Sequence, residues 1–220
     1  FASALSQEEN WQKAVQEVCA TARPEGTPPP DLALLFFSSD HLPDAESIAR
    51  QLSEQLECEN LFGCNGESIV GCELEIEQSP ALSLWLAWLP NVEIIPMHLT
   101  FERTSDGGTI LGWADELMEG WDPSAAMLVV ADPFSFPMEY LLERMNEDHA
   151  GISISGGMAS GASSPGESRL VLGSRIYTDG AACLRLQGEL QVRTLVSQGC
   201  RPIGEPYVIT RSESNVIQEL

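Results

Sequence analysis

Residues 32–39, LALLFFSS, form a short apolar run that follows the proline-rich stretch RPEGTPPPD. A continuous apolar run of this length is typical of a strand that is buried on both faces of a sheet. The next segment, DAESIARQLSEQL, places its apolar residues at helical spacing, and FGCNG then breaks at glycines. The order predicts a buried strand, a helix and a second strand that ends at a glycine corner.

The same order returns further along the chain. AAMLVVADP is a second apolar run, PMEYLLERMNE has helical spacing, and AGISISGG ends on glycines. Gly63 corresponds to Gly156 at an offset of 93 residues, and residues 34–37 correspond to 127–130 at the same offset. Four helical positions share it: Ala45, Ile48, Ala49 and Leu52 correspond to Met138, Leu141, Leu142 and Met145.

This shared offset predicts two copies of one unit, residues 31–99 and 124–200, joined by a linker over 100–123. Segments in which apolar and polar residues alternate follow each glycine corner, as is typical of strands. Each copy should therefore contribute one helix and about five strands. We therefore expect the α/β class, with duplicated β-α-β-β-β units and mixed, largely antiparallel sheets layered with helices.

Residues 1–30 form an N-terminal helix and a proline-rich connector in this interpretation. Ser6 and Glu9 have the spacing of a capping box, and an apolar stripe runs from Trp11 to Ala22. The chain begins at Phe1 without a basic region and an apolar run, so we expect a piece of a longer protein and no signal peptide.

The charge of the chain is strongly negative. The chain contains 33 acidic and 11 basic residues, which gives a formal net charge of −22. Such a surface repels phosphate groups, so we expect neither nucleic acid nor an anionic membrane as a partner. No apolar stretch approaches the length of a membrane span. The six cysteines show no C-x-x-C pair, which favours a reducing cytoplasm, no disulfide framework and no metal site.

The glycine corners are the first candidate ligand site. Backbone N–H groups there can reach a carboxylate or phosphate without obstruction from side chains, although tight turns alone would also require glycine. Arg201, held between Cys200 and Pro202, could bind a carboxylate through both guanidinium nitrogens, or could form a salt bridge within the protein. The predicted ligand-binding residues are Gly63, Cys64, Asn65, Gly156, Gly157, Ser160, Gly161, Cys200 and Arg201.

Catalytic motifs are not matched. GGMASGAS has the glycine spacing of a phosphate-binding loop, but Ala162 stands where that loop needs lysine. GMASG places Ser160 one position too late for a nucleophile elbow. We therefore expect a binding protein and no enzyme. His41, His98 and His149 fit structural roles, and haem ligation remains an alternative.

Several segments together resemble the FIST domain family. They appear in family order over almost the whole chain: FASALS, PDLALLFFSS, GCNGESIVG, ALSLWLAWLP, LVVADPFSF, SGGMASG, QGCRPIGEPYVIT and ESNVIQEL. The resemblance places an N-terminal FIST module over residues 31–200 and the start of a C-terminal FIST module at 201–220.

The resemblance implies an intracellular sensory domain that binds a small ligand in signal transduction. Amino acids are the ligand class that it suggests, with no cofactor, whereas some family members are haem-binding nitric oxide sensors. The implied partners are the C-terminal FIST module of the same chain and signalling proteins. A protein–protein interaction scaffold is a further alternative, favoured by the acidic surface.

Overall fold

Two mixed sheets dominate the computed structural model, which describes residues 1–105, 107–115, 120–195, 203–213 and 216–219. The first sheet has the order β1 (Ala2–Ser6), β6 (Leu82–Ala87), β2 (Leu32–Ser38), β3 (Leu61–Gly66), β11 (Leu170–Leu172) and β12 (Arg175–Tyr177). The second has the order β10 (Ser153–Met158), β9 (Ala126–Ala131), β13 (Ala181–Gly188), β7 (Val92–Thr104) and β8 (Gly107–Leu111).

Each sheet contains one parallel pair among antiparallel neighbours. The parallel pairs are β2 with β3 and β9 with β10. Between the strands of these pairs run the helices α2 (Ala45–Leu56), preceded by the 3-10 turn η1 (Ser39–Asp44), and α3 (Met138–Asp148). The predicted α/β class with largely antiparallel sheets is confirmed.

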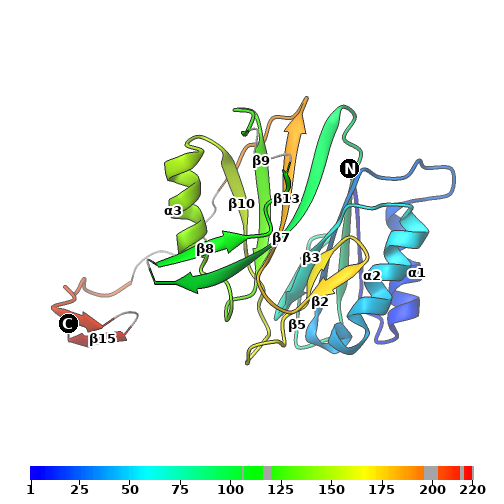
Figure 1. Ribbon diagram of the computed structural model, residues 1–220. Coiled ribbons are helices and arrows are strands. Elements are labelled where there is room, and N and C mark those ends of the chain that lie inside the picture. Colours follow the sequence, from blue (N-terminus) through cyan, green and yellow to red (C-terminus); the bar gives the residue numbers. More distant parts are fainter. Residues whose placement is uncertain (106, 116–119, 196–202, 214–215, 220) are drawn as a thin grey trace.

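The layers are helix, sheet, sheet and helix, as Figure 1 shows. Helix α1 (Trp11–Ala22) and α2 cover the outer face of the first sheet, and α3 covers the second. The inner faces pack against each other, with Phe62 and Cys64 of the first sheet in one cluster with Val130 and Leu184 of the second. Because β2 and β9 are covered on both faces, their sequences are continuously apolar.

Each half of the chain contains one strand-helix-strand unit, in which Gly63 and Gly156 keep the predicted offset of 93, whereas β2 and β9 correspond at an offset of 94. Gly63 lies opposite Leu35 in the first parallel pair, and Gly156 lies opposite Val129 in the second. Leu35 and Val129 both face the helices, whereas the offset of 93 would have matched Leu35 to Leu128, which faces the other sheet. Since side chains alternate along a strand, a shift of one residue reverses the face.

The helical offset of 93 is confirmed at two of its four positions. Ile48 and its counterpart Leu141 are fully buried. Leu52 is fully buried as well, and its counterpart Met145 is 3% exposed. Leu142, the counterpart of buried Ala49, is exposed, because none of the described helices packs beside α3 as α1 packs beside α2. Ile48 follows Leu35 by 13 positions, whereas Leu141 follows the equivalent Val129 by 12, so the first unit, which contains η1, has one more residue between these equivalent positions.

The sheets do not coincide with the predicted ranges 31–99 and 124–200. Strand β7, which was expected in the first copy, pairs with β13 in the second sheet. Strands β11 and β12, which were expected in the second copy, extend the first sheet beside β3. The two halves therefore exchange strands, and the exchange joins both sheets into one body.

Two small hairpins and the N-terminus complete the fold. Strands β4 (Ser68–Gly71) and β5 (Leu74–Glu77) pair with each other, as do β14 (Arg211–Glu213) and β15 (Val216–Glu219), which lie apart from the sheets in Figure 1. The predicted capping box is wrong: Ser6 ends strand β1, and the Asn10 side chain caps α1 by accepting from Lys13 N at 3.0 Å. No described helix has the length and apolar character needed to cross a membrane.

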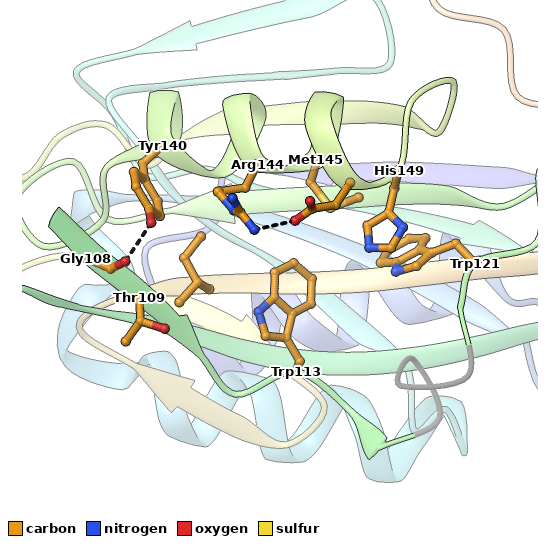
Figure 2. Close-up of a pocket in the computed structure, with 10 residues that line it drawn as sticks. Gly108, Thr109, Trp113, Trp121, Tyr140, Arg144, Met145 and His149 are labelled. Atoms are coloured by element: carbon orange, nitrogen blue, oxygen red, sulfur yellow. Dashed lines mark hydrogen bonds and ion pairs between the residues drawn. The ribbon is translucent and has the colours of Figure 1, made fainter. Parts of the chain in front are cut away.

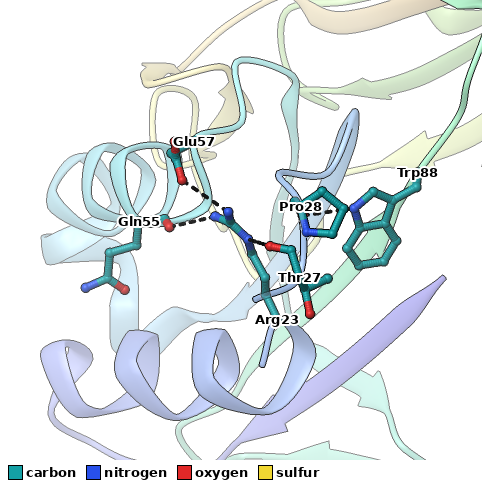
Figure 3. Close-up of polar contacts among 6 residues, drawn as sticks. All are labelled: Arg23, Thr27, Pro28, Gln55, Glu57 and Trp88. Atoms are coloured by element: carbon teal, nitrogen blue, oxygen red, sulfur yellow. Dashed lines mark hydrogen bonds and ion pairs between the residues drawn. The ribbon is translucent and has the colours of Figure 1, made fainter. Parts of the chain in front are cut away.

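Arg23 ties the proline-rich connector to α2 (Figure 3). Its Nε donates to the Thr27 carbonyl, Nη1 donates to the Gln55 carbonyl, and Nη2 contacts the Glu57 carboxylate, each at 3.1 Å. Gln55 lies in the last turn of α2, whose carbonyls have no partner within the helix. The guanidinium therefore caps the C-terminal end of α2 and at the same time holds the proline-rich connector against it.

Candidate functional site

The two glycine corners are places of close backbone approach. A Cβ built on Gly63 would lie 1.7 Å from the Leu35 carbonyl oxygen, and one on Gly156 would lie 1.7 Å from the Val129 oxygen. Their φ angles are 155° and 154°, which side chains rarely adopt. These two glycines allow the parallel strands to meet, so their equivalence across the duplication has a structural cause.

The corners nevertheless converge, as a shared ligand site would require. Asn65 Nδ2 donates to the Ser160 carbonyl at 2.7 Å, and the Glu67 amide donates to Ser160 Oγ at 3.0 Å. Both loops lie at the carboxyl ends of the parallel pairs, which is where open α/β sheets bind ligands. Gly161 lies at the same place, since a Cβ there would be 3.0 Å from Ser39 Oγ.

Asn65 links these loops through a fully buried amide. Its Oδ1 accepts from the Arg169 amide at 2.6 Å, and its own backbone amide donates to the Arg169 carbonyl at 3.2 Å. The side chain is 0% exposed. Its oxygen and one of its amide hydrogens are thus engaged within the protein, and the residue acts as a clamp between β3 and the segment after β10.

Asp132 is a polar group at this end that the sequence analysis missed. It is 1% exposed and accepts from Ser135 Oγ at 2.6 Å and from Ser168 Oγ at 2.7 Å. It follows β9 as Ser38 ends β2. The Asp132 amide donates to the Gly180 carbonyl and the Ser38 amide to the Ala81 carbonyl, in each case just before the neighbouring antiparallel strand. The signal in the sequence was an acidic residue directly after a buried strand, in VVADP.

The other predicted ligand residues differ in exposure. Cys64 is buried, and burial raises the pKa of its thiol to about 12, which keeps the sulfur protonated. Gly157, Ser160 and Gly161 are exposed. Cys200 and Arg201 lie outside the described residues. Among the residues that are described, no group of three histidine, cysteine or acidic side chains is arranged to hold a metal ion.

A cavity of about 500 Å³ lies elsewhere, between β8 and the C-terminal half of α3. Figure 2 shows aromatic side chains around it, with Tyr140 and His149 from the helix side and Trp113 and Trp121 from the segment after β8. The lining residues are Gly108, Thr109, Ile110, Trp113, Trp121, Tyr140, Arg144, Met145, Asp148 and His149.

The polar groups of this β8–α3 pocket are few and ordered. Arg144 contacts the carboxylates of Asp148 at 2.6 Å and Glu147 at 3.3 Å. Tyr140 donates its hydroxyl to the Gly108 carbonyl at 2.6 Å, which joins the helix to β8. The rings of Trp121 and His149 lie 5.6 Å apart. The pocket therefore combines aromatic walls with an ion pair between two of its lining residues, Arg144 and Asp148.

This pocket was not predicted from the sequence, because half of its lining residues lie in the predicted linker, residues 100–123. That linker forms the end of β7, all of β8 and the segment that carries Trp113 and Trp121. Two tryptophans within a polar, glycine-containing connection were the available signal, since such large side chains are rarely left without a contact.

The three histidines lie on different elements. His98 of β7 stacks on Tyr177 with ring centroids 3.9 Å apart, and its Nε2 is 2.8 Å from the Asp179 carbonyl oxygen. His41 of η1 is 1% exposed, and its Nε2 has no partner within the described residues. His149 is the one that lines the β8–α3 pocket.

The stability of the protein should decrease as the pH falls below about 6.5, the ordinary pKa of histidine. Burial lowers the pKa of His41, and the carboxylates of Asp40 and Asp44 only partly oppose this effect. The folded protein then binds fewer protons than the unfolded chain, so stability is full above the unfolded pKa and is lost below it. Urea titrations from pH 7.5 to 5.5 should give a shallower pH dependence for His41→Gln than for wild type, and equal slopes would contradict this assignment.

Comparison with known proteins gives the family. The FIST N domain model matches residues 31–220, including 201–220, the range that sequence analysis assigned to the next module. Rv0628c, an uncharacterised protein of Mycobacterium tuberculosis H37Rv, is 38% identical over 214 residues, which are 95% of this chain and 53% of that protein. Mb0898c of Mycobacterium bovis is 34% identical over 212 residues, with the same coverage.

The chain thus spans about half the length of these curated relatives. The family match covers the glycine corners, the strand exchange and the β8–α3 pocket alike. The chain belongs to the FIST domain family, a family of sensory domains in signal transduction.

Proposed function

We propose that this chain is an intracellular, non-catalytic sensory module, and that its ligand, an amino acid or a similar small carboxylate, binds in the β8–α3 pocket. The volume of the pocket, about 500 Å³, is the observation that carries the proposal. Pockets for small ligands have volumes of roughly 300–1,000 Å³ and combine apolar or aromatic walls with a few polar groups. The glycine-corner site remains a prediction.

The ion pair between Arg144 and Asp148 can receive a zwitterion. Arg144 and Asp148 have side chains that are each 48% exposed, so both can turn toward a ligand at little cost in desolvation. A carboxylate would pair with the guanidinium and an ammonium with Asp148, while the remainder of the ligand lies among the aromatic rings.

Occupancy of the pocket can be transmitted to the sheet through Met145. This side chain lines the pocket and is also 3% exposed within the cluster that contains Met127 and Val129 of β9. A ligand that fixes Met145 therefore alters the packing between α3 and the second sheet, because protein interiors are close-packed.

We also propose that the C-terminal FIST module of the same chain is a partner of this one. Four large apolar residues near the C-terminal hairpin are more than half exposed: Ile203, Tyr207, Val208 and Ile209. An apolar stretch of this kind is typical of a contact surface. Hydrogen exchange over residues 203–213 should be slower in the full-length protein than in this chain, and equal exchange would contradict the contact.

A thermal-shift screen with amino acids and small carboxylates tests the ligand proposal. A ligand at one hundred times its Kd stabilises by about 2.7 kcal/mol, which should raise Tm by roughly 5–10 °C in a protein of this size. Trp113→Ala, which removes one aromatic wall of the pocket, should abolish the shift, whereas Trp88→Ala, at a tryptophan that is also half-buried but lies outside the cavity lining, should retain it.

Three outcomes would count against the proposal. No shift with any compound, or a shift that Trp113→Ala leaves intact, would contradict a ligand in this pocket. A sharp Soret band after addition of haem, lost in His149→Ala, would instead support the haem alternative.

A further inference from the structure

The electrostatics of the β8–α3 pocket favour positive charge. We propose that the pocket recognises its ligand through a protonated nitrogen, so that its ligands are organic ammonium compounds with an apolar or aromatic body. This inference rests on the proposed function and narrows the class of ligand: the ligand needs an ammonium group, whereas it can lack a carboxylate.

Aromatic ring faces supply the first part of the argument. Trp113, Trp121 and Tyr140 all line the cavity. The Tyr140 hydroxyl is engaged by the Gly108 carbonyl, so this residue offers the cavity its ring and no free donor. Aromatic faces, tryptophan above all, attract alkylammonium groups through their quadrupoles and offer nothing equivalent to a carboxylate.

The carboxylates beside Arg144 supply the second part. Arg144, Glu147 and Asp148 form one contact group, in which two negative charges surround one positive charge. The formal net charge of the whole chain, these three residues included, is −22. A cation is therefore drawn to the pocket entrance, whereas an anion must approach against the field of the protein.

The end of helix α3 supplies the third part. The helix ends at Asp148, and its last turn contains no basic residue. The unpaired carbonyls of a helix C-terminus carry partial negative charge, which favours a cation within about one turn. Met145, Asp148 and His149 place this end of the helix against the cavity.

Among the described residues that line the cavity, Arg144 is the only arginine or lysine, and two carboxylates already contact it. Its two terminal nitrogens contact carboxylates at 2.6 Å and 3.3 Å. A ligand carboxylate would have to displace both contacts to reach the guanidinium. An ammonium ligand instead adds to the group beside Asp148 and leaves the contact with Glu147 in place.

Calorimetric titration with three compounds of one skeleton tests the inference on the purified protein. The compounds are 2-phenylethylamine, phenylalanine and 3-phenylpropionate, which carry an ammonium, a zwitterion and a carboxylate. We expect the amine to bind at least as tightly as phenylalanine, and the carboxylate to bind at least about tenfold more weakly than the amine. Equal or tighter binding of 3-phenylpropionate would overturn the inference while supporting the proposed function. Absence of binding by all three, and by alkyl analogues of the same charges, would overturn both.

A pair of charge-neutralising variants assigns the effect to the pocket. Asp148→Asn should weaken binding of the amine by about tenfold or more. Glu143→Gln removes the same charge from the exposed side of α3, outside the cavity lining, and should change the affinity less than about twofold. Equal effects of the two variants would show that only the general field matters and would overturn recognition at Asp148.

Discussion

Gly156→Ala is expected to lower the free energy of unfolding by about 4 kcal/mol or to prevent folding, whereas Gly157→Ala should change it by less than about 0.5 kcal/mol. The two glycines are neighbours in strand β10. A Cβ on Gly156 would lie 1.7 Å from the Val129 carbonyl oxygen, but one on Gly157 would meet nothing within 4 Å. The first substitution must therefore separate the parallel pair β9–β10.

Urea denaturation of the two variants, followed by circular dichroism, measures this difference directly. Gly63→Ala should behave as Gly156→Ala does, because its Cβ would also lie 1.7 Å from a carbonyl oxygen, that of Leu35. Similar stabilities of Gly156→Ala and Gly157→Ala would show that the close approach of the strands is not required by the fold.

Asn65→Ala should cost about 2–4 kcal/mol of stability, since it leaves two partners of a buried side chain without a bond. The lost bonds are those to the Arg169 amide, at 2.6 Å, and to the Ser160 carbonyl, at 2.7 Å. Asn65 is 0% exposed, so water cannot readily replace the amide.

The matched control for this change is Asn60→Ala, just before the same strand. The Asn60 side chain donates one hydrogen bond, to the Asp31 carbonyl at 3.0 Å, in an exposed position. We expect it to cost about 0.5–1 kcal/mol. Hydrogen exchange of the Arg169 amide should accelerate in Asn65→Ala alone, and unchanged exchange there would contradict the role of Asn65 as a clamp.

Local pattern predicted the elements of this fold better than their pairing. The apolar runs of β2 and β9 and the stripe of α2 each depend on neighbouring residues, so period and composition were sufficient to find them. The placement of β7 in the second sheet and of β11 in the first depends on contacts between distant segments. No local period encodes such an exchange.

Of the two candidate sites, one could be predicted from local sequence and the other could not. The glycine corners could be found because Gly63 and Gly156 meet the same steric demand at equivalent positions. The β8–α3 pocket could not, because its walls come from a strand, a connecting segment and a helix that meet only after folding. Trp113 and Trp121 gave the only local hint, in a segment interpreted as a linker.

The indole N–H signals of the five tryptophans provide the most direct test of the ligand pocket. In spectra of the ¹⁵N-labelled protein with a saturating ligand from the screen, the signals of Trp113 and Trp121 should shift. Those of Trp11, Trp85 and Trp88 should stay in place, because these residues do not line the cavity. Shifts confined to these three, or to the backbone amides of residues 63–66 and 156–161, would contradict the pocket and return the ligand to the glycine corners.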